Sequence, residues 1–128
     1  MTKQVNEKNI AVVGVSTDTT KYGYRIFKDM VAAGYRVEGV NPKGGEVAGK
    51  QLHKSLAELV ALDFRPDLVV TVVPPDVTER IVDQCKELGI RELWMQPGSE
   101  SGNAIRTARS YGLQVTFNAC IMVLNKIW

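Results

Sequence analysis

The sequence predicts one α/β domain with a Rossmann-like, doubly wound and mostly parallel sheet of about five strands, with helices on both faces. Short apolar runs rich in Val and Ile alternate with longer amphipathic runs along all 128 residues. The apolar runs lack polar alternation, as strands do when helices cover both faces of their sheet. Glycine follows three amphipathic runs, at Gly34, Gly89 and Gly112, where a helix end favours a residue without Cβ.

Five stretches have the composition of buried strands, and helical patterns separate them. The expected strands are residues 10–15, 35–40, 68–73, 92–96 and 113–117. The helical patterns are Ile26, Met30 and Ala33, then Val77, Ile81, Cys85 and Leu88, then Ile105 with Ala108, and a shorter helix over 55–61. Right-handed crossovers through these helices give an open sheet, whose ligands bind at the carboxyl ends of the strands where the strand order reverses.

Composition limits the classes of function. Lys and Arg are interspersed with acids and the net charge is only +2, which excludes a nucleic-acid-binding stripe. No apolar run approaches the roughly 20 residues that cross a bilayer, and residues 1–8 lack a signal-peptide core, so we expect a cytoplasmic protein. Cys85 and Cys120 lie in unrelated settings with no histidine nearby, so we expect free thiols and no metal site.

The loop after the first strand, residues 14–23, has the sequence GVSTDTTKYG and leads into a helix. Because a helix N-terminus presents free N–H groups and a positive dipole end, this loop can cradle a phosphate. Ser16, Thr17 and Thr19 are the candidate donors, and Lys21 adds positive charge. The alternative is that a Thr or Asp of the loop only caps the helix.

A dinucleotide is the obvious phosphate ligand of this fold, but its sequence pattern is absent. Gly14 stands alone where a GxGxxG loop has three glycines, and residues 41–45, NPKGG, replace the acid that ends the second strand. Lys43 beside two glycines can contact an anion while the backbone approaches it closely, although a solvated turn is the alternative. The pattern favours a ligand with an additional phosphate over NAD.

The other strand ends also carry groups that can contact a ligand. The third strand is followed by Val73-Pro74-Pro75, a rigid apolar surface suited to a purine; we expect Pro75 just outside the next helix and Asp76 as its cap. The fourth strand ends in residues 95–98, MQPG, and the fifth in residues 118–120, NAC. Groups that can contact a ligand thus follow all five strands, and their presence at five strand ends is harder to explain by chance than their presence at one.

In this order, the segments 14–19, 40–45, 72–75, 95–98 and 118–120 resemble the CoA-binding domain at the start of succinyl-CoA synthetase alpha subunits. They are still more similar to the small free-standing CoA-binding proteins of bacteria and archaea. The resemblance covers essentially the whole chain. It implies a Rossmann-like fold that binds coenzyme A or a short acyl-CoA.

The resemblance also implies residue roles. Residues 16–19 would line the phosphate region and Lys43 would contact phosphate. Residues 73–75 would contact the adenosine, and residues 95–97 would flank the path of the pantetheine. The complete set of expected ligand contacts is Gly14, Ser16, Thr17, Asp18, Thr19, Lys21, Tyr22, Asn41, Pro42, Lys43, Val73, Pro74, Pro75, Met95, Gln96, Pro97, Asn118 and Cys120.

The sequence departs from the synthetase pattern in three places. The first loop lacks a second glycine, and no proline follows Cys120. The synthetase works through a phosphorylated histidine, whereas the only histidine of this sequence, His53, lies on an unrelated loop. Nothing resembles a nucleophile with an adjacent base, so we expect no catalytic residues. Cys120 is the one candidate for thiol chemistry, as a mixed disulfide with CoA; a small buried apolar residue is the alternative.

We therefore expect a non-catalytic CoA-binding domain that acts in sensing, storage or delivery. The alternatives are an NAD(P)-binding oxidoreductase or redox sensor, and a module that supplies a CoA site to a separate acyl-CoA ligase partner. No nucleic-acid or membrane partner is expected, and a homo-oligomer is left open. Tyr22 either closes over the ligand or covers the sheet, Tyr24 and Trp94 are expected to pack, and Trp128 is expected as an exposed contact or subunit anchor.

Overall fold

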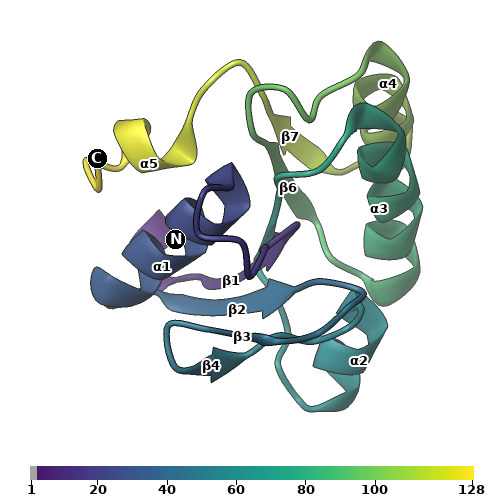
Figure 1. Cartoon of the computed structure of the whole chain (residues 1–128). Coiled ribbons are helices and arrows are strands. Elements are labelled where there is room, and N and C mark those ends of the chain that lie inside the picture. Colours follow the sequence, from purple (N-terminus) through teal and green to yellow (C-terminus); the bar gives the residue numbers. More distant parts are fainter. Residues whose placement is uncertain (1–2) are drawn as a thin grey trace.

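The computed structural model describes residues 3–128, which form a five-stranded sheet between two layers of helices (Figure 1). The strand order is β2-β1-β5-β6-β7, and every neighbouring pair is parallel. The strands are β1 (Asn9–Val13), β2 (Arg36–Val40), β5 (Leu68–Thr71), β6 (Glu92–Met95) and β7 (Gln114–Thr116). The predicted Rossmann-like fold is confirmed.

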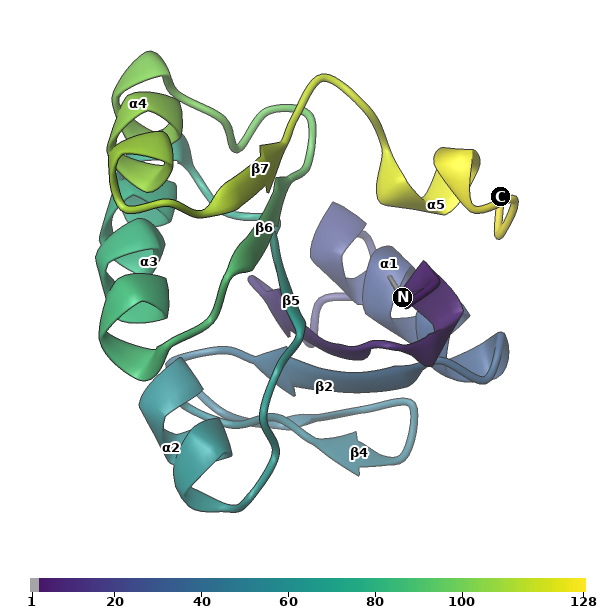
Figure 2. The same ribbon diagram turned by 180° about the vertical axis from the view of Figure 1, so that it is seen from behind.

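Two helices cover one face of the sheet and three cover the other (Figures 1 and 2). The first face carries α1 (Tyr22–Ala32) and α5 (Ile121–Leu124), and the second carries α2 (Leu56–Ala61), α3 (Pro75–Leu88) and α4 (Gly102–Ser110). Ile26 and Met30 of the first predicted helical pattern are fully buried on the first face, and Cys85 is fully buried on the second. Ala33 was wrongly included in the first pattern, because it is the exposed C-cap residue of α1. None of the described helices has the length and apolar character needed to span a bilayer.

The strand β1 ends at Val13 and β5 at Thr71, although the apolar runs that predicted them continue to residues 15 and 73. Val15 is fully buried outside the strand, so burial alone does not distinguish a strand from a packed loop. The expected left-handed glycines are confirmed, with φ of 83° at Gly34, 73° at Gly89 and 81° at Gly112.

Four short elements were not predicted. They are a 3-10 turn, η1 (Val5–Glu7), the antiparallel pair β3 (Glu46–Val47) and β4 (Lys50–Gln51), and the helix α5. Each is too short to show a hydrophobic period. The pair β3–β4 is held against β2 by Lys50, whose Nζ donates to Glu38 Oε2 at 2.6 Å and to Val37 O at 3.1 Å.

The expected cap of α3 is wrong. Pro74 occupies the N-cap position, Pro75 is the first helical residue, and Asp76 lies inside the first turn. Proline suits the first helical position because its missing N–H would have no partner there. Asp76 still acts favourably from the first turn, where a negative charge meets the positive end of the helix dipole.

The backbone of α1 packs directly on the loop that leaves β1. A Cβ added to Gly23 would lie 2.1 Å from Gly14 O, and a Cβ added to Gly14 would lie 2.2 Å from Val72 O. Gly14 also has a φ of 105°, which favours glycine. Since the strand order reverses between β1 and β5, these contacts place the start of α1 at the position where doubly wound sheets bind ligands.

This contact predicts that Gly23→Ala destabilises the domain by about 1–3 kcal/mol, because the added methyl group meets a backbone carbonyl that cannot rotate away. Urea denaturation measures the change in the free energy of unfolding. The matched control is Gly102→Ala, at the start of α4, where the new methyl group would meet only the flexible end of Arg106. Equal stabilities of the two variants would contradict the proposed role of the contact.

Candidate functional site

The loops after β1 and β2 are joined by hydrogen bonds at the carboxyl edge of the sheet. Asn41 Nδ2 donates to Val15 O at 2.7 Å, and Asn41 Oδ1 accepts from the backbone N–H of Lys43 at 2.8 Å. A Cβ on Gly45 would lie 2.7 Å from Thr17 Cγ2, so the two loops touch. Asn41 therefore holds the loops together, while Thr17 of the first loop and Lys43 of the second loop remain exposed.

The first loop is organised by its own polar side chains. Asp18 Oδ1 accepts from Thr20 Oγ1 at 2.7 Å and from Thr20 N at 2.9 Å, and these hydrogen bonds lower the pKa of Asp18 below its usual value. Ser16 Oγ accepts from Asp18 N at 3.0 Å. Asp18 is thus a charged group that stabilises the turn from within.

No side chain caps α1, so the predicted alternative in which a Thr or Asp caps it is wrong. Lys21 occupies the N-cap position and makes no side-chain cap hydrogen bond. Thr17 and Thr19 are exposed in the preceding loop. The first turn of α1 therefore keeps the positive end of its dipole open to an anion.

A cavity of about 200 Å³ lies at the carboxyl edge between α2 and α3. Its lining includes the predicted residues Gly14, Pro42 and Val73. Two basic residues that the sequence did not single out, Lys54 and Arg80, also line it. The rest of the lining is Val13, Val40, Ser55, Leu56, Val77, Ile81 and Gln84. The cavity thus combines a mainly apolar wall with basic side chains.

A second cavity of about 230 Å³ adjoins the ends of β5 and β6. It shares Val73 with the first cavity and also contains the predicted residues Pro74 and Pro97. Met95 differs from these residues because it is fully buried, and its side chain belongs to the core cluster between the sheet and the helices α2, α3 and α4. Asn118 and Pro75 are exposed at the same edge, and Asn118 has a left-handed φ of 62°.

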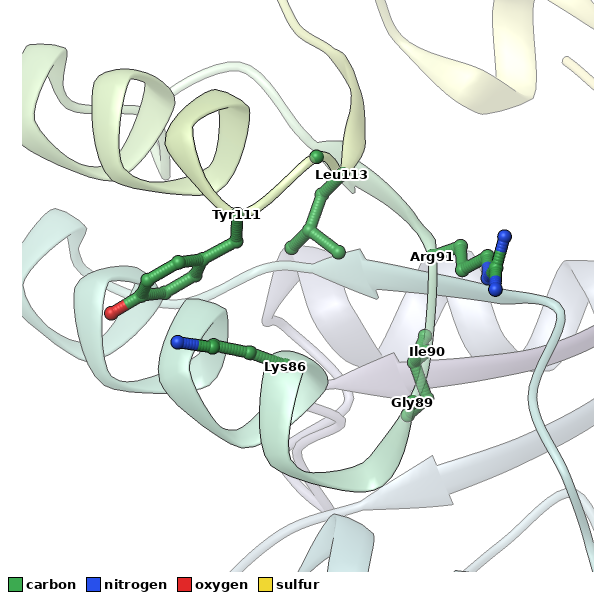
Figure 3. Close-up of a pocket in the computed structure, with 7 residues that line it drawn as sticks. Lys86, Gly89, Ile90, Arg91, Tyr111 and Leu113 are labelled. Atoms are coloured by element: carbon green, nitrogen blue, oxygen red, sulfur yellow. The ribbon is translucent and has the colours of Figure 1, made fainter.

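A larger cavity, of about 380 Å³, lies between the C-terminal ends of α3 and α4 (Figure 3). Lys86 and Tyr111 extend in the same direction, with the Lys86 Nζ 4.2 Å from the Tyr111 ring centroid, whereas Arg91 points away. Tyr111 OH donates to Asp83 Oδ1 at 2.8 Å, and this hydrogen bond raises the pKa of Tyr111. None of the predicted ligand contacts lines this cavity, which lies away from the loops at the carboxyl edge.

On the α1 side of the edge, a buried amide orients two side chains around the Cys120 sulfur. Gln96 is fully buried, and its Oε1 accepts from the backbone N–H of Ile121 at 2.8 Å. Its Nε2 therefore faces the other way, 2.8 Å from Tyr22 OH and 3.4 Å from Cys120 Sγ. Because Tyr22 OH accepts from Gln96, its own proton is free to point at Cys120 Sγ, 3.2 Å away.

These donors stabilise the thiolate of Cys120. Burial alone would raise the pKa of Cys120, but hydrogen bonds from Tyr22, from Gln96 and from two backbone N–H groups of α5 lower it below the usual value. Burial raises the pKa of Tyr22 to about 12, so this hydroxyl keeps its proton near neutral pH. Burial also raises the pKa of Cys85 to about 12, which makes Cys120 the more reactive thiol.

Trp128 is not the exposed contact that was one of the two alternatives, and its role as a subunit anchor stays a prediction. It is half-buried against α1, where its Nε1 donates to Asp29 Oδ2 at 2.7 Å. Trp94 packs in the core and Tyr24 packs against it, as predicted. Among residues 3–128, no three His, Cys, Asp or Glu side chains are grouped so that they could hold a metal ion.

Sequence reasoning missed Lys54 and Arg80, and it did not find that Gln96 orients Tyr22 and Cys120. Arg80 lies three residues after Val77 on α3, so its helical position was the only signal in the sequence. Lys54 precedes a short helix and carries no motif. The grouping of Tyr22, Gln96 and Cys120 joins segments 74 and 98 residues apart, and no local pattern reports it.

Residues 8–126 match the protein family described as CoA binding domain. The chain is 28% identical over 131 residues to the alpha subunit of an ADP-forming acetate–CoA ligase II from Pyrococcus furiosus; the match covers 94% of the chain and 28% of that subunit. It is also 28% identical to the uncharacterized protein YneT of Bacillus subtilis, covering 94% of the chain and 87% of YneT.

Solved structures of similar proteins have the same fold. A conserved hypothetical protein from Pyrococcus furiosus superimposes with a TM-score of 0.84 at 38% identity, covering 91% of the chain and 98% of that protein. A hypothetical protein from Pyrococcus horikoshii superimposes with a TM-score of 0.81 at 30% identity, covering 93% and 82%. The chain therefore spans less than a third of the ligase subunit but most of the length of these two proteins.

The hydrogen bonds around Cys120 predict that Tyr22→Phe slows its alkylation by iodoacetamide several-fold at neutral pH. Loss of a donor to the sulfur destabilises the thiolate, so the pKa of Cys120 rises and less thiolate is present. The pH dependence of the alkylation rate measures this shift. Tyr24→Phe, on the same helix but outside this hydrogen-bonded group, is the control; the same shift in both variants would refute the assignment.

Proposed function

This chain belongs to the CoA binding domain family, and on that basis we propose that it binds coenzyme A across the carboxyl edge of its sheet without catalysis of its own. The observation that carries the proposal is that the carboxyl edge of the sheet has different chemical groups on its two sides. A partly basic cavity lies on the α2–α3 side, and a stabilised thiol lies on the α1 side. Coenzyme A has a nucleotide with phosphates at one end and a thiol at the other.

The cavity between α2 and α3 supports a nucleotide at one end of the site. Lys54 Cε lies 3.7 Å from the position of a Cβ on Gly44, so this side chain runs along the loop that carries Lys43. Arg80 pairs with Asp76 only at 4.0 Å, and both side chains are exposed, so the pair is weak. Lys54 and Arg80 thus supply positive charge around an apolar wall that can hold a purine, and Lys43 adds charge on the loop beside Lys54.

The loop before α1 supports binding of the phosphates between the two ends. Lys21 directly precedes Tyr22, and the first turn of α1 packs through Gly23 on Gly14, which lines the cavity. Thr17 and Thr19 are exposed there as hydrogen-bond donors. We place the pyrophosphate at this loop and the thiol of CoA, or a short acyl thioester, beside Cys120.

NAD(P) fits this edge less well. The only acid in β2 is Glu38, and its carboxylate already accepts from Lys50 Nζ at 2.6 Å and lies 3.3 Å from His53 Nε2. Asn41 and Lys43 follow the end of the strand at Val40. This position therefore has no free acid that could accept hydrogen bonds from the ribose hydroxyls of a dinucleotide.

Two roles are compatible with CoA binding. Matches over 87% of YneT and 98% of a Pyrococcus protein favour a free-standing role in sensing, storage or delivery of CoA. The match to a ligase alpha subunit favours a second candidate, in which the domain supplies the CoA site to a separate acyl-CoA ligase partner. Co-purification of such a partner would favour the second role. A cytoplasmic location stays a prediction from the sequence.

The direct test is the thermal stability of the purified protein with CoA, acetyl-CoA, NAD, NADP and ATP. A ligand that binds only the folded state stabilises it, by about 2.7 kcal/mol at about 100 times its Kd. We expect CoA to raise the Tm by several degrees and NAD and NADP to leave it unchanged. A rise with NAD or NADP alone would overturn the proposal.

Lys43→Glu should weaken CoA binding about tenfold or more, because it removes a charged phosphate contact and places a negative charge beside the anion. Isothermal titration calorimetry measures the Kd. Arg91→Glu is the matched control, since it changes the net charge equally but lies beside the cavity at the far ends of α3 and α4. If both variants bind CoA like the parent protein, Lys43 is not part of the site.

A further inference from the structure

One face of α1 holds the segment that follows α5. Trp128 Nε1 donates to Asp29 Oδ2 at 2.7 Å, and the Arg25 guanidinium lies 4.2 Å from the centroid of the Trp128 rings. Tyr22 meets Trp128 edge-on, with 5.7 Å between ring centroids and an interplanar angle of 69°. Since Tyr22, Arg25 and Asp29 lie three and four residues apart along the helix, Trp128 spans two turns of α1.

The backbone fixes Trp128 relative to α5. The chain reverses at Lys126, which has a left-handed φ of 57°. The N–H groups of Ile127 and Trp128 then both donate to Met122 O, at 2.9 Å and 3.2 Å. Met122 is fully buried two residues after Cys120, and Cys120 and Trp128 both pack against the cluster that contains it, so they belong to one packed unit. We call residues 126–128 the Trp128 clamp.

Tyr22 lies between this clamp and the thiol. Its ring contacts Trp128, and its hydroxyl lies 3.2 Å from Cys120 Sγ. We propose that Trp128 is a positioning residue, which holds the Tyr22 hydroxyl on the Cys120 sulfur and thereby sets the reactivity of this thiol. The inference rests on the proposed function only for the identity of the ligand beside the thiol.

The groups that face Cys120 come from three elements. They are the Tyr22 hydroxyl of α1, the Gln96 amide after β6, and the N–H groups of Met122 and Val123 in α5. Arg25, on the same helix as Tyr22, lowers the pKa of the Tyr22 hydroxyl through its positive charge. Gln96 is held independently, by its bond to Ile121 N, so loss of Trp128 should affect mainly the donor from Tyr22.

The experiment measures the rate of iodoacetamide alkylation of Cys120 against pH in four proteins: the parent, Trp128→Ala, Tyr22→Phe and the double variant. Trp128→Ala should move the midpoint of the rate profile to higher pH and slow alkylation at neutral pH by about threefold or more. If Trp128 acts through Tyr22, the double variant should shift no further than Tyr22→Phe alone.

Two features of the protein separate positioning from general loosening of the fold. Cys85 is fully buried with a pKa of about 12, so mass spectrometry of the alkylated protein detects unfolding as labelling of Cys85. Leu124→Ala removes an apolar side chain of α5 that is 60% exposed, and it should leave the midpoint unchanged. If Cys85 becomes alkylated in the Trp128→Ala variant, the experiment uses Trp128→Phe instead, because Phe keeps a ring but lacks the indole N–H.

An unchanged midpoint in the Trp128 variant that keeps Cys85 unlabelled would overturn the proposal, as would additive shifts in the double variant. A further arm adds acetyl-CoA, which has no free thiol to consume iodoacetamide, to the parent protein. Protection of Cys120 by acetyl-CoA supports the proposed function; absence of protection would refute the placement of the thioester beside Cys120 but would leave the effect of Trp128 on the midpoint as it is measured.

Discussion

The contact of the Gly23 Cα with the Gly14 carbonyl is the constraint on which the candidate site depends. Neither residue has room for a Cβ, so the first turn of α1 packs on the turn that leaves β1. This position brings Tyr22 and the open N-terminus of α1 to the edge where the strand order reverses. In GxGxxG loops a glycine serves the same close packing of helix on strand. This chain reaches a similar geometry with glycines nine positions apart, separated by hydroxyl side chains.

The parallel sheet divides the site chemically. Basic side chains gather on the α2–α3 side around an apolar cavity, whereas the α1–α5 side carries hydrogen-bond donors around one sulfur. A cation close to Cys120 would also favour its thiolate, but here neutral donors do so. On that side the fully buried amide of Gln96 orients its neighbours. Its Oε1 accepts a hydrogen bond from Ile121 N, and this bond determines which way its N–H donors point. Fully satisfied buried polar groups of this kind define one arrangement of their neighbours.

Much of the fold could be predicted because its signals are local. Five apolar runs, three left-handed glycines and the helical spacing of Ile26, Met30 and Cys85 with their neighbours each reflect a few adjacent residues. Asp76 was placed wrongly because a proline pair and an acid allow two N-terminal arrangements that differ by two residues. The short elements β3, β4 and α5 were missed because two to four residues cannot show a period.

The residue pattern alone was enough to predict the Rossmann-like architecture and to point to one sheet edge as a ligand site, since strand and helix patterns are local and parallel strands end at one edge. Its motifs also indicated the family. Which side chains meet at that edge became clear only from the packed structure. Lys54, in the loop before α2, and Arg80, on α3, line one cavity. Met95 is turned into the core, and Tyr22 lies between Trp128 and Cys120. The physical reason is that such contacts depend on how packed layers orient side chains from distant segments, and spacing along the chain carries no record of that packing.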